Sequence, residues 1–112
     1  MAKLNTKRLH LITAVVQAKY GNHVLDAALK AGATGATYFF AQGTGIRQTM
    51  GDAGAGIEIG KRVLFIITDA DKTDAVMKVV AREGKLDTPG AGIAFVQDVL
   101  RVAGAVPPGV TL

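Results

Sequence analysis

Two glycine-rich segments hold the residues of this sequence that could best bind a ligand. The first runs from Gly43 to Gly60, GTGIRQTMGDAGAGIEIG, and six of its eighteen residues are glycine. Because glycine has no Cβ, such a backbone can turn sharply and bring its N–H groups close to a ligand. The second is Lys85 to Gly92, KLDTPGAG. We predict two loops, and a loop as long as the first is usually functional or partly disordered in a small domain.

The ligand expected at these loops is an anion. Backbone N–H groups, helped by the Thr44 hydroxyl, are suited to hold a phosphate. Glycine and proline are also the ordinary residues of turns, so each cluster alone indicates a turn more than a site. The candidate phosphate-binding residues are Gly43, Thr44 and Gly45 in the first loop and Pro89, Gly90, Ala91 and Gly92 in the second.

Composition excludes several catalytic sites. The 112 residues include no cysteine and no serine, so neither a disulfide nor a Cys or Ser nucleophile can form. We expect His10 and His23 to be unrelated structural or surface groups rather than a metal pair. Asp69 and Asp71 stand just before a predicted helix and are interpreted as caps, not as paired catalytic carboxylates. We therefore predict a protein that is not an enzyme and has no metal or cofactor.

Charge and hydropathy bound the partners and the compartment. The net charge of +4 suits an anionic partner, although bases alternate with acids over most of the chain. No apolar run approaches the roughly 20 residues of a membrane span, and the N-terminus has no signal-peptide pattern. With no cysteine in use, these features predict a cytoplasmic protein without membrane insertion.

The first half of the chain reads as strand, helix and strand. Arg8 to Val16, RLHLITAVV, predicts a central strand because both of its faces are apolar. Asn22 is the expected N-cap of a helix that a left-handed Gly32 would end. Ala36 to Gln42, ATYFFAQ, predicts the next strand. The inward face of the helix is expected to consist of Val24, Leu25, Ala28 and Leu29.

The second half repeats this pattern with a strand at each end. Lys61 to Thr68, KRVLFIIT, is the most hydrophobic stretch. Asp69 or Asp71 is expected to cap a helix that runs to about Arg82 and is ended by Gly84. Ile93 to Gln97 predicts a short strand, and Asp98 to Ala103 a helical turn. The inward residues of this helix are expected to be Ala75, Val76, Val79 and Val80.

The order βαββαβ predicts an α+β, ferredoxin-like fold, in which both helices cover one face of a four-stranded antiparallel sheet. The strands are apolar on both faces, so the second sheet face would expose a large apolar patch. Self-association around a symmetry axis would cover it.

Two stretches resemble the PII signalling family. AGATGATYFFAQGTG, Ala31 to Gly45, is similar to its second strand and T-loop base, and GKLDTPGAGIAFVQDVLRVAG, Gly84 to Gly104, to its B-loop and last strand. The resemblance implies one domain over residues 1–104, with a T-loop at 43–60, a B-loop at 84–92 and a tail at 105–112. It also implies a homotrimer that binds adenine nucleotide between subunits and controls a protein target, such as a transporter or enzyme, through the T-loop.

The resemblance extends the nucleotide site beyond the two loops and shows where this chain departs from the family. The added residues are Gly35, Ala36 and Thr37, which would face the adenine from the neighbouring subunit, and Arg62, Leu64 and Ile93. Lys61 and Arg62 flank the loop exit and could be phosphate ligands or surface charges. Ile93 stands where the family usually has a Lys, and Gly104 and Val106 replace two arginines. Fewer phosphate-binding charges predict ADP or AMP in preference to ATP.

The T-loop departs as well. It has Arg47 and Gln48 after its glycine base but no Tyr, so the resemblance implies no modification by uridylylation. A small anion such as bicarbonate, held by Arg47 and Gln48, is a candidate second ligand, and some divergent PII-like proteins are linked to carboxysomes or inorganic-carbon uptake.

Other function classes stay open as alternatives. One is a nitrogen-type PII protein that senses ATP and 2-oxoglutarate. Another is an RNA-binding module of the same βαββαβ order, although KRVLFIIT has one Phe where spaced aromatics would be needed, so no nucleic-acid partner is expected. An enzyme or metal-binding trimer of similar fold is the third.

Overall fold

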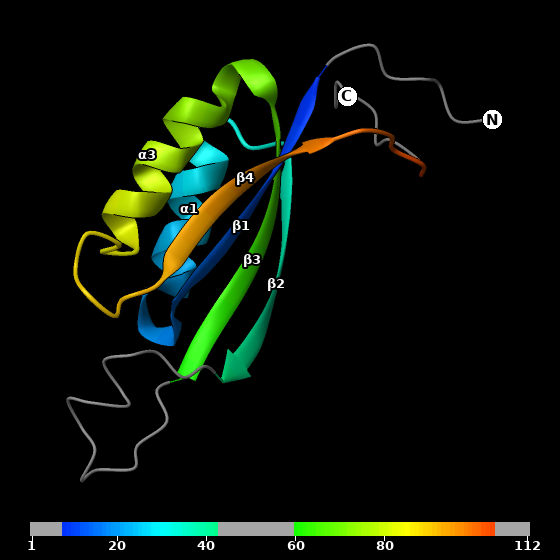
Figure 1. Cartoon of the computed structure of the whole chain (residues 1–112). Coiled ribbons are helices and arrows are strands. Elements are labelled where there is room, and N and C mark those ends of the chain that lie inside the picture. Colours follow the sequence, from blue (N-terminus) through cyan, green and yellow to red (C-terminus); the bar gives the residue numbers. More distant parts are fainter. Residues whose placement is uncertain (1–7, 43–59, 105–112) are drawn as a thin grey trace, which may run out of the picture.

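The computed structural model describes residues 8–42 and 60–104, which form a four-stranded antiparallel sheet with two helices packed on one face (Figure 1). This confirms the ferredoxin-like α+β fold and its βαββαβ order. Short 3₁₀ turns, Ala18–Tyr20 and Ala70–Lys72, lead into the two helices. The elements are β1 (Leu9–Gln17), α1 (Gly21–Lys30), β2 (Gly35–Gln42), β3 (Gly60–Asp69), α3 (Thr73–Glu83) and β4 (Ile93–Val99).

The strand order is β2-β3-β1-β4, and every neighbouring pair is antiparallel. β1 is central, as its two apolar faces predict. It pairs with β3 at Ala14↔Leu64 and with β4 at Val15↔Ile93. β2 and β4 are the edge strands.

The core lies between the helices and one face of the sheet. Alternate residues in the middle of β1 and β3, such as Ile12 and Ile66, point to the helices and are fully buried. Val24 and Ala28 of α1 and Val76 and Val80 of α3 complete this core, as predicted; the other buried core members are Ala14, Val16 and Leu64. Two inward predictions are wrong, because Leu29 is 45% exposed and Ala75 is also exposed. Both sit at the margin of the apolar stripe, where helix rotation decides burial.

The predicted helix caps are also wrong. α1 begins at Gly21, one residue before Asn22, whose side-chain oxygen instead accepts a hydrogen bond from Arg62 at 2.6 Å. α3 begins at Thr73, after the 3₁₀ turn that contains Asp71, and its N-cap position is Lys72 with no side-chain cap bond. Asp69 is at the N-cap position of that 3₁₀ turn and not of α3, and its side chain makes no cap bond there.

Each helix is followed by a residue in the left-handed conformation, but the residue type differs. Gly32 follows α1 with φ of 115°, which confirms the predicted left-handed ending. After α3 the left-handed residue is Lys85, with φ of 57°, and not the preceding Gly84. The Leu86 N–H donates to the Ala81 carbonyl at 3.0 Å, which closes the turn. Position 84 favours glycine for a steric reason, because a Cβ would lie 2.9 Å from the Val80 carbonyl oxygen.

The last strand is longer than predicted. β4 stays paired with β1 as far as Leu9↔Val99, and residues 100–104 contain no helix. The predicted helical turn from Asp98 to Ala103 is therefore wrong, because the ladder to β1 satisfies the backbone of Asp98 and Val99. Gly60 belongs to β3, whereas the rest of the predicted T-loop and the tail at 105–112 lie outside the described residues.

Candidate functional site

The bases of both glycine-rich loops meet at one end of the sheet. β2 ends at Gln42, which pairs with Gly60 at the start of β3, and the α3–β4 connection reaches the same end (Figure 1). Lys61 links the two segments. Its Nζ lies 3.4 Å from the Gly90 carbonyl oxygen and 3.5 Å from that of Ala91. The fold therefore brings together two segments that are far apart in the sequence.

The B-loop offers fewer amides than its sequence suggests. Pro89 has no N–H, and the Ala91 N–H donates to the Thr88 carbonyl at 3.1 Å. Ala91 is also buried. Gly90 and Gly92 have φ of 80° and 155°, conformations that favour glycine. Of residues 89–92, Gly90 and Gly92 are thus the ones whose amides could face an anion.

The predicted adenine-facing residues lie far from this end within one chain. Gly35, Ala36 and Thr37 begin β2, whereas the loop base lies at the end of that strand. A Cβ at Gly35 would meet no atom within 4 Å, so the surface there is open. One chain does not assemble the predicted site, and a second copy would have to supply these residues.

Two further predicted residues differ in their accessibility. The Leu64 side chain is fully buried under the helices, so only its backbone could approach a ligand. Ile93 is 58% exposed on the sheet face that the helices leave open. Gly43, Thr44, Gly45, Arg47 and Gln48 lie outside the described residues. Ligand binding by all of these positions stays a prediction.

Arg62 lies on the helix face of β3 and is 8% exposed. Its Nη1 donates to Asn22 at 2.6 Å, and its guanidinium stacks 4.8 Å from the Tyr38 ring centroid and 4.5 Å from that of Phe40. The side chain also fills the space beside Gly21, where a Cβ would lie 2.4 Å from the Arg62 Cδ. The sequence analysis did not predict these contacts of Arg62 with α1 and β2. Tyr38 and Phe40 were a usable signal, because residues two positions apart in a strand share a face and could both contact one cation.

The open face of the sheet is apolar. Phe39 and Phe65 lie side by side on it, with ring centroids 5.5 Å apart. Phe95 and Ile93 extend the patch onto β4, and both are exposed. We call Phe39, Phe65, Ile93 and Phe95 the open-face patch. Exposed aromatics in contact with one another mark an interaction surface more than a solvated one.

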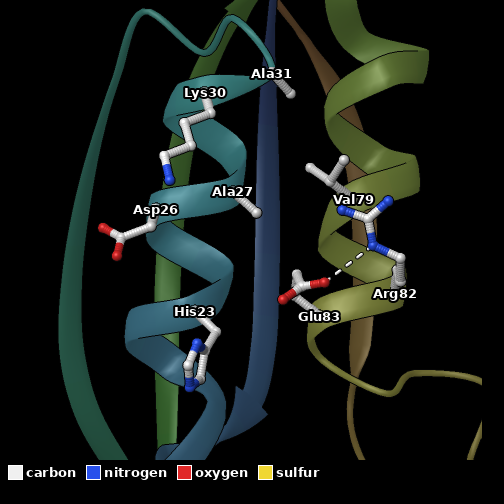
Figure 2. Close-up of a pocket in the computed structure, with 8 residues that line it drawn as sticks. All are labelled: His23, Asp26, Ala27, Lys30, Ala31, Val79, Arg82 and Glu83. Atoms are coloured by element: carbon white, nitrogen blue, oxygen red, sulfur yellow. Dashed lines mark hydrogen bonds and ion pairs between the residues drawn. The ribbon is translucent and has the colours of Figure 1, made fainter.

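A shallow groove runs between α1 and α3 on the outer side of the helices (Figure 2). It encloses about 460 Å³. Charges of both signs line it, and the Arg82 guanidinium, which bonds to Glu83 at 2.9 Å, holds the pKa of that carboxyl below its usual range. The groove includes none of the predicted nucleotide residues. Its walls are His23, Asp26, Ala27, Lys30, Ala31, Val79, Arg82 and Glu83.

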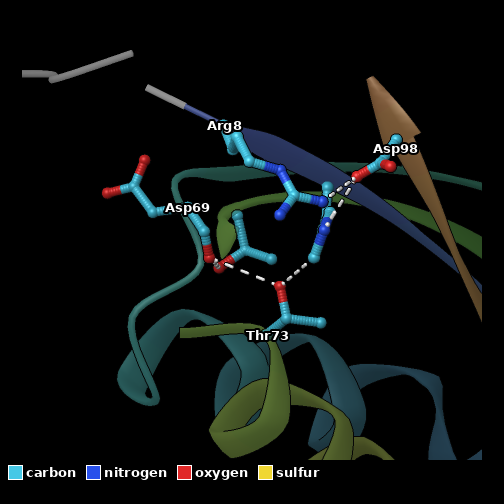
Figure 3. A network of polar contacts seen from close by, with 6 residues as sticks. Arg8, Asp69, Thr73 and Asp98 are labelled. Atoms are coloured by element: carbon cyan, nitrogen blue, oxygen red, sulfur yellow. Dashed lines mark hydrogen bonds and ion pairs between the residues drawn. The ribbon is translucent and has the colours of Figure 1, made fainter. Parts of the chain in front are cut away.

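A polar network joins β1, β4 and the start of α3 at the end of the sheet opposite the loop bases (Figure 3). Arg8 donates to the Asp98 carboxylate at 2.8 Å, and His10 Nε2 lies 3.0 Å from the same oxygen. His10 Nδ1 lies 2.6 Å from the Thr73 hydroxyl, which donates to the Asp69 carbonyl at 3.4 Å. His10 is thus a structural residue between two elements.

This network predicts a pH dependence of stability. The Arg8 guanidinium, with a smaller contribution from His10, lowers the pKa of Asp98 below its ordinary value. A carboxyl whose pKa is lower in the folded state adds stability above the unfolded pKa of about 3.9, and loses it as pH falls through the folded pKa. We expect Asp98→Asn to unfold at lower urea concentration than the wild type near neutral pH. The two should converge near pH 2, and an equal difference at every pH would contradict the assignment.

Within residues 8–42 and 60–104, no group of three His, Asp or Glu side chains is placed to hold a metal ion. The same part of the chain contains no helix that is long and apolar enough to cross a membrane.

The fold and the paired loop bases define a ferredoxin-like domain with two connections that meet at one end of the sheet. The family model described as nitrogen regulatory protein P-II matches residues 9–105. The chain therefore belongs to the P-II family of signalling proteins, which generally bind nucleotides and regulate other proteins. No curated protein matches the sequence.

Two solved structures show how widely this fold is shared. The crystal structure of Arabidopsis thaliana PII bound to citrate matches 80% of this chain and 76% of its own, with a TM-score of 0.61 and 21% identity. A Bacillus cereus protein related to NIF3 matches with a TM-score of 0.68 and 13% identity, over 89% of this chain and 27% of its own. At these identities the likeness concerns the fold alone.

Proposed function

We propose that the protein is a homotrimeric regulator that binds ADP or AMP in clefts between subunits and acts on a partner protein through its T-loop. The observation that carries this proposal is the contact of Lys61 with the Gly90 and Ala91 carbonyls, which holds the T-loop exit against the B-loop. A ligand bound there would touch both loops at once. Ligand binding could then be converted into a change of T-loop conformation.

The arrangement of the other predicted residues supports a cleft between copies. Gly35 to Thr37 lie at the opposite end of β2 from the loop bases. The open-face patch gives neighbouring copies an apolar surface to pack together, which P-II family membership leads us to assign to a trimer. In this assembly the first residues of β2 from one subunit would face the loops of the next.

The preference for ADP or AMP rests on charge. Ile93 places an apolar side chain at the start of β4, and Arg62 is bonded within the domain. A triphosphate needs more cationic partners than a monophosphate or diphosphate does.

We further propose that the protein is a cytoplasmic regulator and not an enzyme, and that its partner is a transporter or enzyme. Bicarbonate is proposed as its second ligand, as in a carboxysome-associated role.

A ligand screen tests this function. Thermal unfolding should be followed with AMP, ADP, ATP and cyclic AMP, each with and without bicarbonate and 2-oxoglutarate. At saturation, ADP or AMP should raise the melting temperature by roughly 5 °C or more, because a ligand that binds the native state stabilises it. Calorimetric titration should then give a lower Kd for ADP or AMP than for magnesium–ATP. Tight ATP binding strengthened by 2-oxoglutarate would instead support a nitrogen-type sensor.

A single-domain RNA-binding module is the second candidate because three phenylalanines lie on the open sheet face. Base stacking would need that face free, whereas self-association covers it. Oligomeric state therefore separates the two functions. A monomer that binds single-stranded RNA and no adenylate would favour this candidate.

A further inference from the structure

Two cations flank the T-loop exit, and the fold gives them different environments. Lys61 and Arg62 are consecutive in β3, so their side chains leave opposite faces of the sheet. Arg62 takes the helix face, where Asn22 and two aromatic rings engage its guanidinium. A guanidinium held this way is not placed to bind a phosphate in a cleft outside the helix layer.

Lys61 is in the opposite situation. Its Nζ is 3.4 and 3.5 Å from the Gly90 and Ala91 carbonyl oxygens, longer than the roughly 2.7–2.9 Å of a charge-assisted hydrogen bond between ammonium and oxygen. An ammonium group has three N–H donors. Two long contacts leave it with capacity for a stronger acceptor at the same place.

The B-loop beside Lys61 has little other means to attract an anion. Only Gly90 and Gly92 of residues 89–92 have amides that could face a ligand, and the following residue is the apolar Ile93. Two amides without a full positive charge form a weak phosphate site. The nearby ammonium supplies that charge.

We propose that Lys61 is the phosphate-binding cation of the nucleotide cleft. This inference rests on the proposed function and adds a residue to it. Without anion, Lys61 holds the B-loop by its two carbonyls; with anion, its ammonium pairs with a phosphate oxygen. A single flexible ammonium matches a monophosphate or a diphosphate, so the same residue contributes to the preference for AMP and ADP.

Calorimetric titration of the full chain with ADP, AMP and adenosine tests the proposal. Lys61→Gln keeps an unbranched polar side chain but removes the charge. We expect its Kd for ADP to rise about tenfold, while its Kd for adenosine stays within about twofold of wild type. Lys61→Arg should keep most of the ADP affinity. Lys78→Gln removes the same charge from an exposed position on α3 and should leave the Kd of both ADP and adenosine unchanged.

The outcomes of these titrations distinguish a failure of the Lys61 proposal from a failure of the proposed function. If wild type binds ADP and Lys61→Gln binds it equally well, Lys61 is not the phosphate ligand and the proposed function stands. If Lys61→Gln raises the Kd for adenosine and the Kd for ADP by the same factor, the residue affects the shape of the cleft and its charge does not bind the phosphate. That result also overturns the proposal. If wild type binds neither adenylates nor adenosine, the proposed function itself fails.

Discussion

Replacing Gly92 with alanine is expected to destabilise the domain by about 3 kcal/mol and to abolish adenylate binding. Gly92 has φ of 155°, which residues with a Cβ rarely adopt, and an added Cβ would lie 1.9 Å from the Val15 carbonyl oxygen. The group that the Cβ would meet is backbone and cannot rotate away, and Val15 belongs to a central strand paired on both sides. Relief therefore requires the B-loop to move away from β1.

Urea denaturation of Gly92→Ala against Gly60→Ala measures this effect. At Gly60 an added Cβ would meet Ala18 at 3.7 Å, an ordinary contact, so this control should be neutral or slightly stabilising. A domain of this size has about 5–15 kcal/mol of stability, so the loss at Gly92 should be plain. An unchanged unfolding midpoint for Gly92→Ala would show that the B-loop is not pressed against β1.

Replacing Phe95 with glutamate is expected to convert the proposed trimer into monomers. Phe95 is 44% exposed in the open-face patch. Around a threefold axis the substitution would bury three carboxylates near one another, and each buried charge without a partner opposes association strongly. A loss of 2 kcal/mol or more per subunit, typical of a central interface aromatic, would suffice at micromolar concentration.

Light scattering during size-exclusion chromatography gives the mass directly. Wild type should run at three times the 11.6 kDa chain mass and Phe95→Glu at the chain mass itself. Phe40→Glu is the matched control, because Phe40 is more exposed but lies on the helix face of the edge strand β2. Adenylate binding should disappear with the trimer. A wild type that is already monomeric would contradict both this prediction and the cleft between subunits.

Much of the fold could be predicted from sequence because it depends on local patterns. Apolar runs gave the strands, Gly32 gave the end of α1, and the βαββαβ order gave the antiparallel sheet with helices on one face. The errors lay at element ends. The Asn22 cap failed because a distant arginine competes for its side-chain oxygen, and the turn at Asp98 failed because the ladder with β1 continued.

The candidate site was predicted less completely. The second loop was predicted because glycine adopts positive φ without steric cost, as at Gly90 and Gly92. The first loop, apart from Gly60, lies outside the described residues. Which loop amides remain available was not predictable, because the Ala91 N–H is bonded to Thr88 only in the folded turn.

The sequence by itself determined the βαββαβ order of a ferredoxin-like domain, since hydrophobic periodicity and glycine placement act over short distances. The P-II class was indicated by the resemblance of two stretches to that family. Only the tertiary structure decided which of the adjacent cations Lys61 and Arg62 packs against α1 and which lies beside the B-loop. KRVLFIIT is apolar on both faces, so its pattern cannot say which face meets the helices. The register of β3 against β1 settles this by pairing Leu64 with Ala14 on the buried side, which sends Arg62 to Asn22 and leaves Lys61 beside Gly90.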